Sequence, residues 1–225
     1  MISDTKVVAI GGGTGLSTML KGLKLHTHNI TAVVTVADDG GSSGILRSDL
    51  GMLAPGDVRN CVSALAEVDP VMGELLNFRF KDGSLKGHSL GNLFLAALNE
   101  TSSSFDEAVK KFSHLTGVVG TVYPVTNESV TLSALLEDGR LIEGESHIGV
   151  HHDGPKNGIV KLMVNPEKPK AVDGVIKALE KADIIVLGPG SLYTSIIPNL
   201  LVDGVVDAIK KSNAVKIYVC NLSLI

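Results

Sequence analysis

A run of glycines between an apolar segment and an amphipathic segment is the feature that most constrains the fold. Residues Val7–Ile10 are apolar and partly β-branched, and Gly11–Gly15 reads Gly-Gly-Gly-Thr-Gly. Apolar residues then recur at helical spacing through Thr14–Leu23, and Ile30–Val36 is a second β-branched run. Strand, glycine turn, helix and strand in this order predict a βαβ unit with parallel strands and a right-handed crossover.

The rest of the chain predicts a helical middle segment, then paired strands, then a return to alternating strands and helices. Helical spacing extends over Asp57–Val68, Val71–Phe78, Ser89–Asn99 and Phe105–Phe112, with Asp57, Ser89 and Ser104 as expected N-caps. Strand patterns cover Val118–Pro124, Val130–Leu136 and Leu141–Glu145, with a hairpin turn at residues 137–140. The last third predicts strands at Ile159–Val164, Ile184–Leu187 and Val215–Cys220 and helices at Ala171–Lys181 and Asp203–Lys211. We therefore expect one α/β domain over residues 1–225. Its fold is a Rossmann-like, doubly wound, mainly parallel sheet, with a helical middle segment and an antiparallel β-hairpin insertion.

Composition narrows the class of protein. The chain is 44% apolar but only 4% aromatic, so the core is expected to be aliphatic. A net charge of −4 argues against broad nucleic-acid binding. No apolar run is long enough to span a bilayer and no secretion signal precedes Lys6, which predicts a cytoplasmic protein without a membrane partner. Cys61 and Cys220 lack metal-site spacing and are expected to be two buried thiols.

The first glycine loop is a candidate phosphate site. Glycines let a ligand approach the main chain closely, and the following helix directs unpaired N–H groups at the loop. We expect phosphate contacts from Gly12, Gly13, Thr14 and Gly15. The alternative is a tight turn without a ligand. Leu16 stands where a dinucleotide fingerprint has its third glycine, which disfavours NAD(H) binding.

A second loop of this kind follows the expected strand Ile184–Leu187 and reads Gly-Pro-Gly-Ser-Leu-Tyr-Thr-Ser. Its hydroxyl groups lie near backbone amides, which suits an anion. The candidate ligand residues are Gly188, Gly190, Ser191, Thr194 and Ser195. A strand-ending turn is the alternative, but two such loops in one domain favour phosphate binding more than either alone.

Charged side chains follow the second strand. A carboxylate at Asp38 suits ribose hydroxyls or Mg²⁺ bound to phosphates, whereas Asp39 suits either that role or an Asx-turn. Ser42 lies in the same polar segment. Arg47 and Arg59 suit capture of a phosphate or carboxylate, or surface salt bridges.

A second glycine-flanked helix start contains His88 and Asn92. His88 is a candidate ligand contact, although a histidine before a helix more often caps it or bonds within the core. Asn92, one turn into the helix, is a candidate contact to a base or sugar. His151-His152-Asp153 resembles a metal cluster, but adjacent loop histidines usually point apart, so no metal is expected there.

Five segments together resemble the YvcK group of gluconeogenesis factors in the CofD-like superfamily. They are Ala9–Leu16, Ala37–Gly44, Pro55–Arg59, Gly87–Leu93 and Leu187–Ser195. The resemblance implies a Rossmann-like fold and a ligand such as UDP-N-acetylglucosamine. It also implies a part in cell shape and in envelope-precursor supply during gluconeogenic growth. Family members usually continue beyond residue 225, so strands and part of the ligand pocket are expected to be missing.

The CofD enzymes of that superfamily transfer a 2-phospholactyl group from a guanosine diphosphate donor with Mg²⁺. By position, the resemblance implies that Gly12–Gly15 and Gly190–Ser195 face the diphosphate. It gives Asp38 the role of the acidic residue that serves metal or acceptor.

Two function classes follow, with a weaker third. The first is a regulatory protein that binds a nucleotide-diphosphate sugar without turnover, because no persuasive nucleophile or acid–base pair accompanies the loops. The second is a Mg²⁺-dependent transferase in which Asp38 holds the metal. The third is dinucleotide binding, with NAD as a surrogate ligand. An enzyme of amino-sugar synthesis and a second copy of the chain are the expected protein partners.

Overall fold

The computed structural model describes residues 3–150 and 158–221 of the chain. Its strands are β1 (Val7–Gly11), β2 (Ile30–Val34), β3 (Thr121–Pro124), β4 (Thr131–Leu136), β5 (Leu141–Glu143), β6 (Ile159–Asn165), β7 (Ile184–Leu187) and β8 (Val215–Tyr218). Its longer helices are α1 (Thr14–Leu23), α2 (Gly41–Leu50), α3 (Gly56–Leu65), α4 (Pro70–Asn77), α5 (Leu90–Glu100), α6 (Phe105–Leu115), α8 (Asp173–Lys181) and α10 (Val205–Lys211). Short helical segments are α7 (Glu145–Gly149), the π-helical turn Leu192–Ile196 and α9 (Ile197–Leu200).

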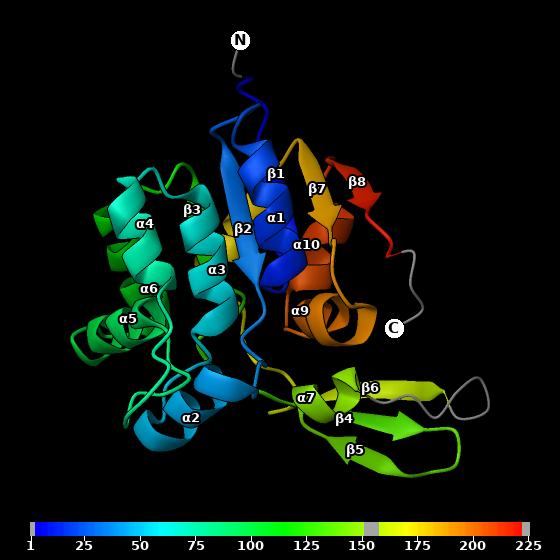
Figure 1. Cartoon of the computed structure of the whole chain (residues 1–225). Coiled ribbons are helices and arrows are strands. Elements are labelled where there is room, and N and C mark those ends of the chain that lie inside the picture. The colour runs from blue at the N-terminus through cyan, green and yellow to red at the C-terminus, as the bar shows by residue number, and fades with distance from the viewer. Residues whose placement is uncertain (1–2, 151–157, 222–225) are drawn as a thin grey trace.

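The main sheet has the parallel topology that the glycine-interrupted start predicts. Its strand order is β3-β2-β1-β7-β8, and every neighbouring pair is parallel. Strands β1 and β7 pair in register, with Ile10 opposite Leu187. The carboxyl ends of all five strands therefore meet at one edge, where the loops of the predicted site begin (Figure 1).

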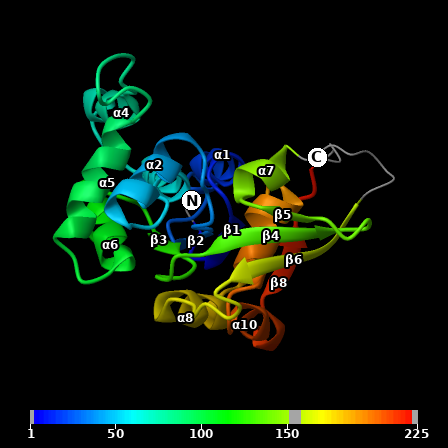
Figure 2. The same cartoon turned by 90° about the horizontal axis from the view of Figure 1, so that it is seen from below.

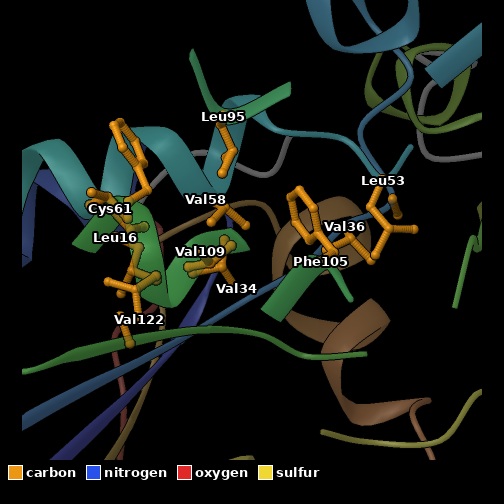
Figure 3. Packing of buried hydrophobic residues seen from close by; sticks show 14 of the residues in the cluster. Leu16, Val34, Val36, Leu53, Val58, Cys61, Leu95, Phe105, Val109 and Val122 are labelled. Carbon is orange, nitrogen blue, oxygen red and sulfur yellow. The ribbon is translucent and has the colours of Figure 1, made fainter. Parts of the chain in front are cut away.

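Helices cover both faces of this sheet, which confirms the doubly wound prediction. Ala32 and Val34 of β2 belong to the core cluster shared with α1, α3, α5 and α6, whereas Val33 belongs to the cluster shared with α8 and α10. Because successive strand residues point to opposite faces, this one strand serves both cores. Figure 3 shows how closely the aliphatic side chains of the first cluster pack, with Leu16 beside Cys61 and Val34 beside Val109.

A three-stranded antiparallel sheet in the order β5-β4-β6 lies beyond the carboxyl edge of the main sheet (Figures 1 and 2). The predicted hairpin between β4 and β5 is confirmed. The expectation that Ile159–Val164 continues the main α/β sheet is wrong, because this segment is β6 and pairs antiparallel with β4. Alternating apolar residues in β4, whose buried positions are Leu132, Ala134 and Leu136, face the core.

Several local predictions are corrected. Helix α2 begins at Gly41, inside a segment whose glycines and serines give little helical signal. Asp57 is not an N-cap but lies inside α3, which Pro55 precedes, whereas the N-caps Ser89 and Ser104 are confirmed. Cys61 is buried as expected.

Cys220, in contrast to the expectation, is exposed just after edge strand β8. The predicted absence of a metal cluster at residues 151–153 concerns positions outside the described ranges. None of the helices in the described ranges combines the length and apolar character needed to cross a membrane.

Candidate functional site

The two predicted glycine loops lie against each other at the carboxyl ends of β1 and β7. The N–H of Gly188 donates a 2.9 Å hydrogen bond to the carbonyl oxygen of Ile10. A Cβ atom on Gly15 would lie only 2.6 Å from the carbonyl oxygen of Pro189 and 3.5 Å from the nitrogen of Gly190. Glycine at position 15 therefore permits the close approach that joins the two loops into one surface.

A buried asparagine fixes this arrangement. The Nδ2 atom of Asn199 donates hydrogen bonds to the carbonyl oxygen of Gly11 at 3.1 Å and to that of Ser195 at 2.7 Å. The side chain is fully buried. Because both acceptors are backbone atoms of the loops, Asn199 sets the distance between them without taking any of their N–H donors.

Backbone donors remain at both loops. No described residue accepts a hydrogen bond from the N–H of Gly190 or Ser191, and the first N–H groups of α1 have no acceptor within the helix. The hydroxyl of Ser191 caps the following turn by accepting from the N–H of Thr194 at 3.4 Å. The N–H of Gly13 is engaged by the carboxylate of Asp57. The surface can therefore bind an anion with donors from two loops.

Acidic side chains gather beside the loops. Burial raises the pKa of Asp57 to about 7, and repulsion from Asp38 and Glu145 adds to this rise. The hydrogen bond from Gly13 and the charge of Arg59 act in the opposite direction. Asp57 therefore exchanges its proton near neutral pH, in direct contact with the first glycine loop.

Glu145, the first residue of α7, lies close to Asp38, Asp39 and Asp57. Burial raises the pKa of Glu145, while a hydrogen bond from the hydroxyl of Thr194 lowers it and the charges of Asp38 and Asp39 raise it. Within residues 3–150 and 158–221, no three histidine, cysteine or acidic side chains are close enough to hold a metal by themselves. A magnesium ion needs only one or two protein carboxylates when phosphates complete its coordination. These acidic side chains could therefore bind Mg²⁺ only together with an anionic ligand.

A pocket of about 190 Å³ lies among the N-terminal ends of α2, α3 and α5. Ser42, Arg59 and Asn92 line it, and a chain of hydrogen bonds joins these buried side chains to one another and to His88. The Oγ atom of Ser42 lies 2.9 Å from Nδ1 of His88 and accepts from Nδ2 of Asn92 at 3.1 Å. Nε of Arg59 donates to Oδ1 of Asn92 at 3.3 Å. The structure thus brings together four of the predicted site residues from three separate segments: Ser42 from α2, Arg59 from α3, and His88 and Asn92 from the start of α5.

Asp38 and Asp39, adjacent in sequence, have different surroundings. Asp38 lines the pocket and accepts from the N–H of Gly40 at 2.9 Å. Asp39 accepts from the N–H groups of Glu145 and Ser146, both at 2.9 Å, and so caps α7. Asp39 is therefore engaged by the small sheet.

Arg47 is likewise engaged by the protein itself. Its guanidinium donates to the carbonyl oxygens of Asp38 at 3.1 Å and Val130 at 2.9 Å. These bonds tie the end of β2 to the start of β4. Arg47 does not line the pocket in which the other predicted arginine, Arg59, lies.

Sequence reasoning missed four residues of this site. Asp57 and Asn60 lie within α3 and contact the first glycine loop, since a Cβ atom on Gly13 would collide with both. Their signal is the Pro-Gly-Asp-Val-Arg-Asn segment, in which the sequence predicts for Asp57 only an N-cap or a salt bridge with an arginine. Glu145 and Arg79 arrive from distant segments and give no local signal.

Comparisons with known proteins agree with this geometry. The sequence model of the 2-phospho-L-lactate transferase CofD family matches residues 7–224. The gluconeogenesis factor of Bacillus subtilis is 47% identical over 220 residues, which are 96% of this chain and 68% of that protein. A crystal structure of a UPF0052 family member from Bacillus halodurans superposes with a TM-score of 0.92 at 46% identity, covering 98% of this chain and 70% of that one.

The chain is shorter than its relatives. It spans 68% of a curated relative from Thermoanaerobacterium thermosulfurigenes, to which it is 58% identical over 221 residues. It spans 49% of a relative from Clostridium acetobutylicum at 53% identity. Matches of this extent, over a sheet whose glycine loops meet at one edge, show that the chain belongs to the CofD family and to its gluconeogenesis factor group.

Proposed function

We propose that this chain binds the diphosphate of a nucleotide sugar, of the UDP-N-acetylglucosamine type, between its two glycine loops. The observation that carries the proposal is the contact between the loops. A Cβ atom on Gly12 would lie 2.7 Å from Oγ of Ser195, and one on Gly15 would lie 2.6 Å from the carbonyl oxygen of Pro189. The two sets of backbone donors are thus close enough to serve one diphosphate.

The chemistry of the site supports binding without turnover. Backbone N–H groups at the start of α1 and after β7 stabilise negative charge without offering a nucleophile. His88, the candidate acid–base residue, is buried and bonded to Ser42. We therefore infer a regulatory role, and the name of the Bacillus subtilis relative directs it to gluconeogenic growth. Cell morphogenesis and cell-wall precursor supply are the processes in which a sensor of this ligand would act, with an enzyme of amino-sugar synthesis as its partner.

Calorimetric titration with UDP-N-acetylglucosamine, UDP, GDP and NAD tests the proposal. We expect the uridine compounds to bind and NAD to bind weakly or not at all. Gly15→Ala should abolish binding, because the added Cβ meets backbone atoms of the second loop. Gly22→Ala is the matched control: Gly22 lies in the same helix and a Cβ there meets nothing within 4 Å. Absence of heat with every nucleotide would remove the proposal.

A Mg²⁺-dependent transferase is the second candidate, and the carboxylates beside the loops favour it. Asp38 and Asp57 line the same pocket, and the family model is named for a transferase. Asp38, with phosphate oxygens of the ligand, would hold Mg²⁺, which would neutralise charge on the transferred group. Asp38→Asn should then abolish a Mg²⁺-dependent turnover that the exposed control Asp49→Asn retains. No turnover across a panel of nucleotide diphosphate donors would leave the binding role.

A further inference from the structure

The pocket beside the glycine loops contains a buried arginine, Arg59, which has no part in the proposed binding of the diphosphate. Arg59 is only 7% exposed, yet within the described residues it forms no ion pair. Its Nε donates to Asn92 at 3.3 Å and its Nη1 donates to Oδ1 of Asn77 at 2.8 Å. No residue in the described ranges accepts from Nη2. A buried guanidinium with neutral partners and a spare donor is costly unless an anion joins it.

A second arginine lines the same pocket. Arg79 lowers the pKa of Arg59 by like-charge repulsion, after the larger effect of burial. Arg79 is exposed, donates from Nη1 to the carbonyl oxygen of Gly87, and forms no ion pair with any residue that the structure describes. Two guanidinium groups that line one pocket, neither of them in a salt bridge with a described residue, form a site for an oxyanion.

The position of Arg59 is fixed by its surroundings. A Cβ atom on Gly91 would lie 3.0 Å from Cδ of Arg59 and 2.6 Å from the carbonyl oxygen of Leu76. The glycine therefore lets the arginine stem pass between α3 and α5. Asn92, which accepts from Arg59, is held in turn by Ser42. A donor group that is held in place before binding loses little entropy when the anion arrives.

The pocket is lined by charges of both signs. Asp57 and Asn60 are the lining residues nearest Gly13, and Asp38 lies nearest Gly40 and Gly56, whereas Arg59 and Arg79 provide the positive charge. Asp57 attracts Arg59 electrostatically but does not form a salt bridge with it. The atoms nearest to Gly12, Gly13 and Gly15 belong to neither arginine. We therefore expect an anion bound by the arginines to be separate from a diphosphate bound at the glycine loops.

We propose that Arg59 and Arg79 form a second anion subsite in this pocket, which binds a phosphate or carboxylate group outside the nucleotide diphosphate. The proposal deepens the proposed function, on which it rests for the placement of the nucleotide. The preferred ligands are therefore those that carry a separate acidic group, either on the sugar or on a second molecule.

Titration with free anions tests the subsite. Inorganic phosphate and malonate are titrated separately by calorimetry into the protein and its variants. Arg79→Gln should weaken binding of the preferred anion by about 10-fold or more, as expected for loss of a charged hydrogen-bond donor. Arg59→Gln should weaken it further. Arg140→Gln, which alters an exposed arginine paired with Asp138 on the distant hairpin, should leave binding unchanged. Binding of phosphate alone or of malonate alone supports the subsite and identifies the group that it takes.

A glycine variant separates this proposal from the nucleotide proposal. Gly15→Ala should lose UDP binding but retain the arginine-dependent anion binding, because it alters only the loops. Anion affinity that is equal in the wild type, Arg79→Gln and Arg59→Gln overturns the subsite, as does the absence of anion binding to the wild type. Neither result affects the UDP titration. Arg79 is exposed, so its variant is expected to fold even where Arg59→Gln does not.

Discussion

The two halves of the candidate site present donors of different kinds. Beside β1 and β7, the donors are backbone N–H groups, and glycines make room for them. Among α2, α3 and α5, the donors are side chains joined by hydrogen bonds from His88 to Arg59. The first, which we call the backbone half, depends on the absence of side chains. The second, the side-chain half, depends on the identity of its side chains. Each half therefore fails under a different kind of substitution.

Asp57 lies between the halves, and its titration has the largest predicted effect. Its pKa is raised from 3.8 to about 7 in the folded protein, so the folded state holds a proton that the unfolded state has lost. Stability should therefore fall as the pH rises from about 4 to about 7, by on the order of 4 kcal/mol at most, and then level off. Urea unfolding at several pH values without divalent cations measures this.

Asp57→Asn removes the titrating group and should flatten most of this slope. At pH 8 the variant should be more stable than the wild type, because the wild type then carries a buried negative charge. A residual slope of the same sign is expected from Glu145, whose pKa is also raised. An unchanged pH dependence in Asp57→Asn would show that Asp57 does not link the two halves electrostatically.

Asn199→Ala tests the backbone half by removing the side chain that bonds to both loops. Two carbonyl oxygens lose the side-chain donor, although that of Gly11 keeps the N–H of Thr35, so we expect a loss of roughly 2 kcal/mol in the free energy of unfolding. UDP affinity should fall as well, since only the β1–β7 pairing and the Gly188–Ile10 bond then hold the loops together. The exposed Asn213→Ala serves as the control in urea unfolding and calorimetry. Full UDP affinity in Asn199→Ala would mean that the loops hold each other without it.

Gly91→Ala tests the side-chain half, because the added Cβ atom crowds the side chain of Arg59. The added Cβ meets a backbone oxygen and the arginine stem, so a loss of about 2 kcal/mol in stability is expected. Gly73→Ala, also at a helical glycine but with its nearest atom 3.8 Å away, should be neutral or stabilising. Thermal unfolding compares the two variants. Equal stability would indicate that the arginine stem is free to move.

Arg47→Gln has the smallest predicted effect on stability. It tests whether Arg47 only stabilises the fold, in contrast to Arg79, which is proposed to bind an anion. Its bonds go to backbone carbonyl oxygens, so stability should fall by about 1 kcal/mol. Phosphate and malonate affinities should not change, in contrast to Arg79→Gln. A reduced anion affinity in Arg47→Gln would extend the side-chain half beyond the pocket described above.

The backbone half could be predicted from sequence, since its signals are local. Strand, glycine turn and helix follow one another within residues 7–23, and the parallel topology then brings the second loop to the same edge. The side-chain half could be predicted only in part. Arg59, His88 and Asn92 lie in recognisable segments, but Arg79 reaches the pocket from an irregular stretch after α4.

The sheet that residues Ile159–Val164 join was predicted wrongly for a similar reason. Ile159–Val164 has the composition of a strand, but composition does not state which sheet a strand joins, and β4 provided the partner. Asp38 and Asp39 give the same local signal, yet only the tertiary structure places α7 above one of them. Such differences depend on contacts between distant residues, Leu132 with Val164 in the strand pairing and Asp39 with Glu145 in the cap.

The bonds of Asp39 and Arg47 also bear on how this fold can be re-engineered. The segment after β2 holds the small sheet through the cap on α7 and the bonds to the start of β4, and that same segment supplies Asp38 to the pocket. Exchanging the small sheet for another hairpin would thus leave Asp39 and Arg47 without their partners beside the pocket. Recombination between homologues should place its crossover points so that residues 38–47 and 129–146 come from the same parent.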